Sequence, residues 1–145
     1  MKLLSGIVLA AFLAMPLHAE ESLIGTIQQL QDEWAAAYNA HDLAKLLGFY
    51  EVDAVLVAPG APPAYGHEAI GEVFRGLFPL LIDLSLVTDE VRTLGENYAV
   101  EIGHSTYQAV SEDGKTSAGS DNYEVVWHRG EDGVWHYVTD MFNSR

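Results

Sequence analysis

The sequence contains no cysteine, few basic residues and only one long apolar run. Without cysteine, the chain can carry neither a disulfide framework nor a lipid anchor attached to a cysteine. Basic residues number 7 against 21 acidic ones, which gives a formal net charge of −14 at pH 7. An acidic body repels phosphate backbones and anionic lipid, so we predict no nucleic-acid partner and no membrane partner for the mature chain.

The apolar run lies at the start of the chain, in the segment MKLLSGIVLAAFLAMPLHA. One lysine, a long apolar stretch and a small terminal residue are typical of a secretory signal peptide, with cleavage after Ala19. A membrane anchor is the alternative, but the run is short and no stop-transfer charges follow it. We therefore expect residues 1–19 to be a signal peptide, residues 20–145 to be one domain, and the protein to be periplasmic or secreted.

Motifs for covalent, nucleotide-dependent and metal chemistry are also missing. The sequence has no glycine-rich phosphate loop, no serine nucleophile elbow and no cysteine nucleophile. The histidines after residue 19 form neither an HxH nor an HExxH spacing. We predict no metal and no cofactor.

The first part of the remaining chain has helical periodicity. From Ser22 to His41, apolar side chains recur every three or four residues, which indicates one helix with a single inward face. Asp42 is a good N-cap for a second, short helix, and GHEAIGEVFRGLFPLLI predicts a third. Between these two helices, residues 53–58 are typical of a short strand that ends at Pro59.

After about residue 84 the pattern changes to that of strands. Alternating polarity between turn signals predicts four strands, at 84–94, 97–110, 120–129 and 134–142. Helices followed by a meander of strands indicate an α+β domain: a cone-shaped, curved antiparallel sheet with three N-terminal helices on its concave face. Such a cone encloses an apolar interior suited to a small molecule.

The order of these segments resembles a known superfamily. The helix with Trp34 is followed by AHDLAKLLGFYEVDAVLVAPG, by YGHEAI at the start of a helix, by NYEVVW and by DGVWHYVTDMFNS. Over essentially the whole mature chain, these segments are similar to the nuclear-transport-factor-2-like (NTF2-like) superfamily, in its SnoaL-like or DUF4440 branch. The resemblance implies the cone-shaped fold and a homodimer formed through the outer face of the sheet. It implies no single activity, because the superfamily includes isomerases, hydrolases, cyclases, proteins labelled oxidoreductases and non-catalytic binding modules.

Ketosteroid isomerases within this superfamily allow one mechanism to be tested on the sequence. They use an aspartate base at the end of the strand before the proline, and an oxyanion hole made by a tyrosine and a protonated aspartate. Here the base position falls on Ala58, the tyrosine near Trp34 and the second aspartate near Tyr123. Alanine cannot abstract a proton from carbon, so we predict that the isomerase mechanism is not used.

Alternation along NYAVEIGHSTYQAV assigns residues to the two faces of one strand. Val100, Ile102 and His104 share a face, which by resemblance looks into the cone. Glu101 and Gly103 then fall on the opposite face, where we predict an interface or ion-pair residue and a close approach of strands.

The last hairpin supplies the other polar candidates. A turn through GEDG sets Tyr123 opposite Asp140, on the face that continues to Phe142. We therefore take His104, Asp140 and Tyr123 as candidate catalytic residues: a histidine beside a carboxylate can act as a general base, and a tyrosine can donate to a substrate oxygen. The alternative is structural, with the histidine at the rim of the core and Asp140 holding backbone amides.

The predicted function is that of an exported homodimer that binds a small, mainly apolar or ring-containing molecule in the cone. The alternative is an enzyme, such as an isomerase, cyclase, hydrolase or oxidoreductase-labelled SnoaL-like type, that uses a His104/Asp140 acid–base pair. A third reading has the cavity filled by side chains and only the dimer face functional. The residues on the other face of the last hairpin, including Val126, Trp135, Tyr137 and Met141, form the predicted dimer patch. The predicted ligand-binding wall consists of Trp34, Tyr38, Val57, Phe74, Phe78, Ile102, Val125 and Phe142.

Overall fold

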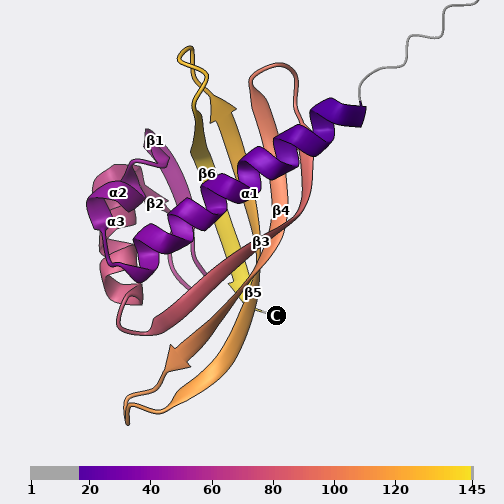
Figure 1. Cartoon of the computed structure of the whole chain (residues 1–145). Helices are drawn as coiled ribbons and strands as arrows, with labels where there is room; N and C mark the ends of the chain where they lie inside the picture. Colours follow the sequence, from indigo (N-terminus) through magenta and orange to yellow (C-terminus); the bar gives the residue numbers. More distant parts are fainter. Residues whose placement is uncertain (1–16, 145) are drawn as a thin grey trace, which may run out of the picture.

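Three helices and six strands make up residues 17–144, the part of the chain that this computed structural model describes (Figure 1). In chain order they are α1 (Leu17–Asn39), α2 (Leu43–Leu47), β1 (Tyr50–Val57), β2 (Ala64–Tyr65), α3 (Gly66–Leu77), β3 (Leu81–Thr93), β4 (Tyr98–Val110), β5 (Thr116–Arg129) and β6 (Trp135–Ser144). The predicted signal peptide falls mainly on residues outside this range. Within it, no helix combines the length and the apolar character needed to cross a membrane.

The helices lie where the periodicity predicted them. The Asp42 side chain caps α2 by accepting a hydrogen bond from the backbone N–H of Lys45 at 3.0 Å, which confirms the predicted N-cap. The third helix ends at Leu77, earlier than predicted, because the chain enters β3 at Leu81. Figure 1 shows α1 lying across the sheet and α2 and α3 grouped at the side near β1 and β2.

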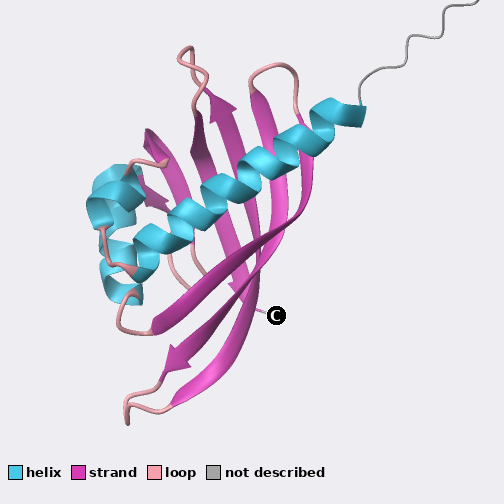
Figure 2. Ribbon diagram, in the orientation of Figure 1, coloured by secondary structure: helices cyan, strands magenta, loops and turns pink. Residues whose placement is uncertain are grey.

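The strands form one curved, open sheet in the order β2-β1-β6-β5-β4-β3 (Figure 2). The α+β prediction is confirmed, but the sheet is mixed rather than antiparallel, because β1 runs parallel to β6. Leu56 of β1 is aligned with Asp140 of β6. These two strands are separated in the chain by one helix and four further strands, so no hairpin imposes an antiparallel pairing on them.

The last hairpin contains a β-bulge that the sequence analysis missed. Trp127 pairs with Tyr137, whereas the neighbouring Val126 pairs with Thr139, so Val138 has no opposite residue. The bulge changes the phase of β6, and both Tyr137 and Asp140 are buried on the inner side. The predicted pairing of Tyr123 with Asp140 is therefore wrong. Tyr123 lies opposite Phe142, and Asp140 lies opposite Val125.

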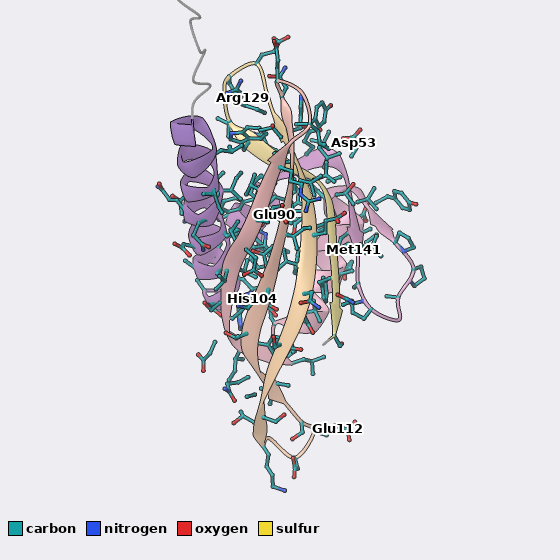
Figure 3. All side chains as sticks on the ribbon, turned by 90° about the vertical axis from the view of Figure 1, so that its right-hand side faces the viewer. Asp53, Glu90, His104, Glu112, Arg129 and Met141 are labelled. Carbon is teal, nitrogen blue, oxygen red and sulfur yellow. The ribbon has the colours of Figure 1, made fainter. Side chains whose placement is uncertain are left out.

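The two faces of the sheet have different environments. The inner face packs against α1 and α3, while the outer face exposes Val87, Ile102 and Met141, each by more than a third. Figure 3 shows Met141 and Asp53 on the side of the sheet away from α1. Trp135 and Tyr137, which were predicted for the outer patch, are instead buried because of the bulge.

Candidate functional site

A pocket lies between α1, α3, β3 and the inner face of the sheet. Its empty volume is about 530 Å3 with the open mouth included, and the space in which a water molecule could be centred is about 60 Å3. The pocket is therefore narrow, and it suits a slim ligand rather than a bulky one. Its wall consists of Gln31, Trp34, Tyr38, Phe74, Leu77, Leu81, Leu84, Leu86, Ser105, Tyr107, Asp121, Tyr123, Val125, Tyr137, Asp140 and Phe142.

A buried carboxylate on β4 organises one end of this pocket. Glu101 has no exposed surface, and each of its oxygens accepts two hydrogen bonds. The donors are Gln31 Nε2 at 2.7 Å, Thr88 Oγ1 at 2.7 Å, the Tyr123 hydroxyl at 2.8 Å and Trp127 Nε1 at 2.8 Å. They come from α1, β3 and β5, so the carboxylate ties the helix and two strands to β4.

The four donors fit the ionised form of Glu101. The amide of Gln31 is oriented by the Tyr137 hydroxyl, which donates to Gln31 Oε1 and leaves the Nε2 group to donate to Glu101. Burial raises the pKa of the Glu101 carboxyl, and the hydrogen bonds act in the opposite direction. Glu101 therefore places a satisfied negative charge close behind the pocket wall.

Asp140 is a second buried carboxyl, and it lies on the pocket wall itself. The Tyr50 hydroxyl donates to Asp140 Oδ2 at 2.6 Å. Burial raises the pKa of Asp140 to about 7, the charge of Glu101 adds to the rise, and the bond from Tyr50 opposes it. A carboxyl group with this pKa exchanges a proton near neutral pH, which is the range in which general acids and bases work.

Trp34 contributes an indole ring to the wall and a buried donor without a partner. Its Nε1–H forms no hydrogen bond with any described residue by geometry. Burial raises the pKa of the Tyr50 hydroxyl, and the neighbouring Trp34 indole opposes that rise. The ring stacks on Tyr38 with centroids 5.6 Å apart and on Tyr137 at 6.4 Å. A buried donor left in this state is ready for an acceptor supplied by a bound molecule or by water.

Asp121 is the third carboxylate of the pocket. It is 5% exposed, and the Tyr107 hydroxyl donates to its Oδ1 at 3.0 Å. The Tyr107 ring lies over Gly119, where an added Cβ would come within 2.2 Å of the ring. Glycine at this position therefore allows the ring to lie across β5 toward Asp121.

The structure brings together most of the predicted pocket residues. Tyr123 and Asp140, from the catalytic set, both lie on the wall. From the predicted ligand-binding set, Trp34, Tyr38, Phe74, Val125 and Phe142 also lie there. What each of them binds stays a prediction.

Four predicted site residues lie elsewhere. His104 points to the outer side, where its Nδ1 contacts Asp89 at 2.8 Å, so it forms no pair with Asp140. Val57 and Ile102 line a separate hollow beside Ala58, and Phe78 is buried against Tyr38 and does not reach the pocket. The face of β4 that carries Ile102 and His104 was predicted to look into the cone, and it is the outer face.

The residues that sequence reasoning missed are those whose role depends on partners from other elements. Glu101 was placed on the outer face, and Gln31 and Asp121 were not singled out. The one available signal was the close spacing of Glu101, Gly103 and Ser105, because a strand face with a carboxylate and two small residues leaves room for larger neighbours. Indeed, an added Cβ at Gly103 would lie 2.3 Å from the Tyr123 hydroxyl.

Comparison with known proteins defines the family. A family model described as a SnoaL-like domain matches residues 32–140. The chain belongs to the SnoaL-like domain family. No curated protein matches this SnoaL-like chain, and the match does not specify the DUF4440 branch.

Solved structures show the same fold. A ketosteroid isomerase-like protein from Erwinia carotovora atroseptica is 19% identical, with a TM-score of 0.74 over 86% of this chain and 96% of that one. An NTF2-like superfamily protein from Salmonella enterica is 18% identical, with a TM-score of 0.72 over 86% and 92% of the two chains. The predicted NTF2-like fold, with its curved sheet and N-terminal helices, is therefore confirmed. At these identities the likeness concerns the fold alone.

Proposed function

We propose that this SnoaL-like protein is exported and binds a small, mainly apolar molecule in the pocket between α1, α3 and the sheet. The observation that carries the proposal is the wall itself, in which aromatic and aliphatic side chains surround a few buried polar groups. That composition is typical of small-molecule sites, where apolar surface supplies affinity and the polar groups fix orientation. The ketosteroid isomerase mechanism is not part of the proposal, because Ala58 lies outside this pocket and carries no base.

Native mass spectrometry of residues 20–145, exported to the periplasm and purified gently, tests binding and assembly together. A retained mass that is lost on denaturation supports the proposal and provides a ligand to identify. A protein without any adduct that also gains no thermal stability from a panel of small apolar and aromatic compounds contradicts it. The matched variant is Phe74→Asp, which places a charge in the pocket wall and is expected to abolish retention.

An enzyme that works by acid–base catalysis is the second candidate, and Asp140 supports it. Its carboxyl lies on the pocket wall with a pKa of about 7, and Tyr123 lies two residues from Val125, the partner of Asp140 across the hairpin. If a substrate is found, Asp140→Asn should reduce turnover by about 10²-fold or more while binding is retained. If Asp140→Asn converts the substrate at the wild-type rate, acid–base catalysis by Asp140 is excluded and the binding function remains.

Assembly as a homodimer through the outer face of the sheet is the remaining part of the proposal. Ile102 and Met141 are exposed by 37% and 43%, and they flank Glu124 on adjacent strands. Exposed apolar side chains on the outer face of a sheet are typical of an interface. Sedimentation at micromolar concentration should show a dimer that Ile102→Lys converts to monomer, and a stable wild-type monomer would refute the assembly.

A further inference from the structure

The charges around the pocket are of one sign. Among the described residues that line it, the ionisable side chains other than tyrosine are Asp121 and Asp140, and no lysine, arginine or histidine is present. Glu101, directly behind the wall, adds a third carboxyl. The ionised carboxylates among these groups would repel an anionic ligand and attract a cation.

The three carboxyl groups do not have the same capacity to receive a ligand. Glu101 is already saturated by four donors, and Asp140 holds a proton near neutral pH. Asp121 is a buried residue, and the hydrogen bond shown for its side chain among the described residues is the one donated by the Tyr107 hydroxyl. An ionised carboxylate can accept several hydrogen bonds, so Asp121 can take a further donor from a bound molecule.

Aromatic faces complete this environment. The pocket wall contains seven aromatic side chains, among them Tyr107 and Tyr123 next to Asp121 and the unpartnered indole of Trp34 further along. The faces of such rings carry partial negative charge and attract ammonium groups. A carboxylate flanked by aromatic rings, with no competing basic side chain on the described wall, is a suitable environment for an organic cation.

We propose that the pocket takes a slim organic amine, whose ammonium group is held by the Asp121 carboxylate and the adjacent tyrosine rings while its apolar body lies against Trp34 and Phe74. This inference rests on the proposed binding function and names the chemical class of its ligand. Asp140 lies opposite Val125, four residues along β5 from Asp121, which corresponds to about 13 Å at the rise of a strand. The ammonium site is thus separated from the proton-holding carboxyl by the length of a one-ring or two-ring compound.

Three ligands of matched shape test the inference on the mature protein by isothermal titration at neutral pH. They are 2-phenylethylamine, which is a cation, 2-phenylethanol, which is neutral, and 3-phenylpropanoate, which is an anion. We expect the amine to bind about tenfold or more tightly than the alcohol, and the carboxylate to bind weakest, because a charge-assisted contact in a dry site is stronger than a neutral one. An alcohol that binds as tightly as the amine, or a carboxylate that binds best, overturns the inference.

The variant Asp121→Asn locates the site. It should weaken binding of the amine by about tenfold or more and leave the affinity for the alcohol within about twofold. The control Asp53→Asn, on the outer side of the sheet, should change neither affinity. Equal loss for both ligands contradicts a role for Asp121 in cation recognition. If the variant fails to fold, the wild-type ligand series still decides the question.

The outcomes separate this inference from the proposed function. Binding of the alcohol without preference for the amine leaves small-molecule binding intact and refutes only the ammonium site. Failure of all three ligands, together with no retained mass in the native spectrum, refutes both.

Discussion

Replacing Asp140 with asparagine should change how the stability of the protein depends on pH. Burial and the charge of Glu101 raise the pKa of Asp140 from 3.8 to about 7, so between these values the folded chain holds a proton that the unfolded chain has released. Because the pKa is higher in the folded state, this stabilising contribution is complete below the unfolded pKa. It is lost as the pH rises toward the folded pKa.

The size of the effect follows from the same two values. A difference of about three pH units, at 1.36 kcal/mol for each unit, corresponds to a loss on the order of 4 kcal/mol between pH 3.8 and about pH 7. Asparagine keeps the shape of the side chain and an oxygen that accepts from Tyr50, but it cannot ionise. The variant should therefore lack this part of the pH dependence.

Urea unfolding at intervals from about pH 4 to about pH 8 measures the effect. We expect the wild-type free energy of unfolding to fall relative to that of Asp140→Asn as the pH rises through this window, so that the variant is the more stable protein at the upper end. Asp53→Asn, an exposed change on β1, serves as the control and should follow the wild type. Parallel curves for the wild type and Asp140→Asn would show that Asp140 is not a buried, proton-holding group, and the reasoning would be refuted.

Two further predictions test the packing around the pocket, and a third tests the outer placement of His104. Glu101→Gln replaces a carboxylate that accepts four hydrogen bonds by an amide that can accept only at its oxygen. The free energy of unfolding, measured by chemical denaturation, should therefore fall by about 2–4 kcal/mol. The control Glu124→Gln, at an exposed position, should change it by less than about 0.5 kcal/mol. Gly103→Ala places a Cβ 2.3 Å from the Tyr123 ring and 2.4 Å from a backbone oxygen, so the free energy of unfolding should fall by about 1–3 kcal/mol. The control Gly25→Ala, in α1 with no atom within 4 Å of the added Cβ, should raise it by about 0.5–1 kcal/mol. Similar effects at both glycines would contradict the close approach at Gly103. His104→Ala should leave the affinity for any pocket ligand unchanged in titration, and a large loss would mean that the outer placement of this histidine is wrong.

The sequence determined the number, order and type of most elements. Regular spacing of apolar residues identified the three helices, and alternation between turn signals located the four long strands within a few residues. The N-cap at Asp42 could be read directly, because a cap depends on residues three positions apart. The aromatic wall from Trp34 to Phe74 was also accessible, since an inward helix face is a local property.

Only the tertiary structure decided which face of β4 looks inward. Alternation grouped Val100, Ile102 and His104 on one face, and the family resemblance assigned that face to the interior, which gave the inverted assignment and with it the wrong placement of His104. The inner face carries Glu101 and Gly103 because α1, β3 and β5 bring four donors and a tyrosine ring to that side. A carboxylate is stable inside a protein when its hydrogen bonds are supplied, and those donors are remote in sequence.

The bulge at Val138 was equally beyond local reasoning. One unpaired residue changes the phase of β6, so that Tyr137 and Asp140, which simple alternation places on opposite faces, both come to lie on the pocket wall. The sequence could therefore predict an apolar cavity with aromatic side chains in its wall. Strand register decided which carboxyl groups lie on the pocket wall. Burial in the packed fold decided which of them holds a proton near neutral pH.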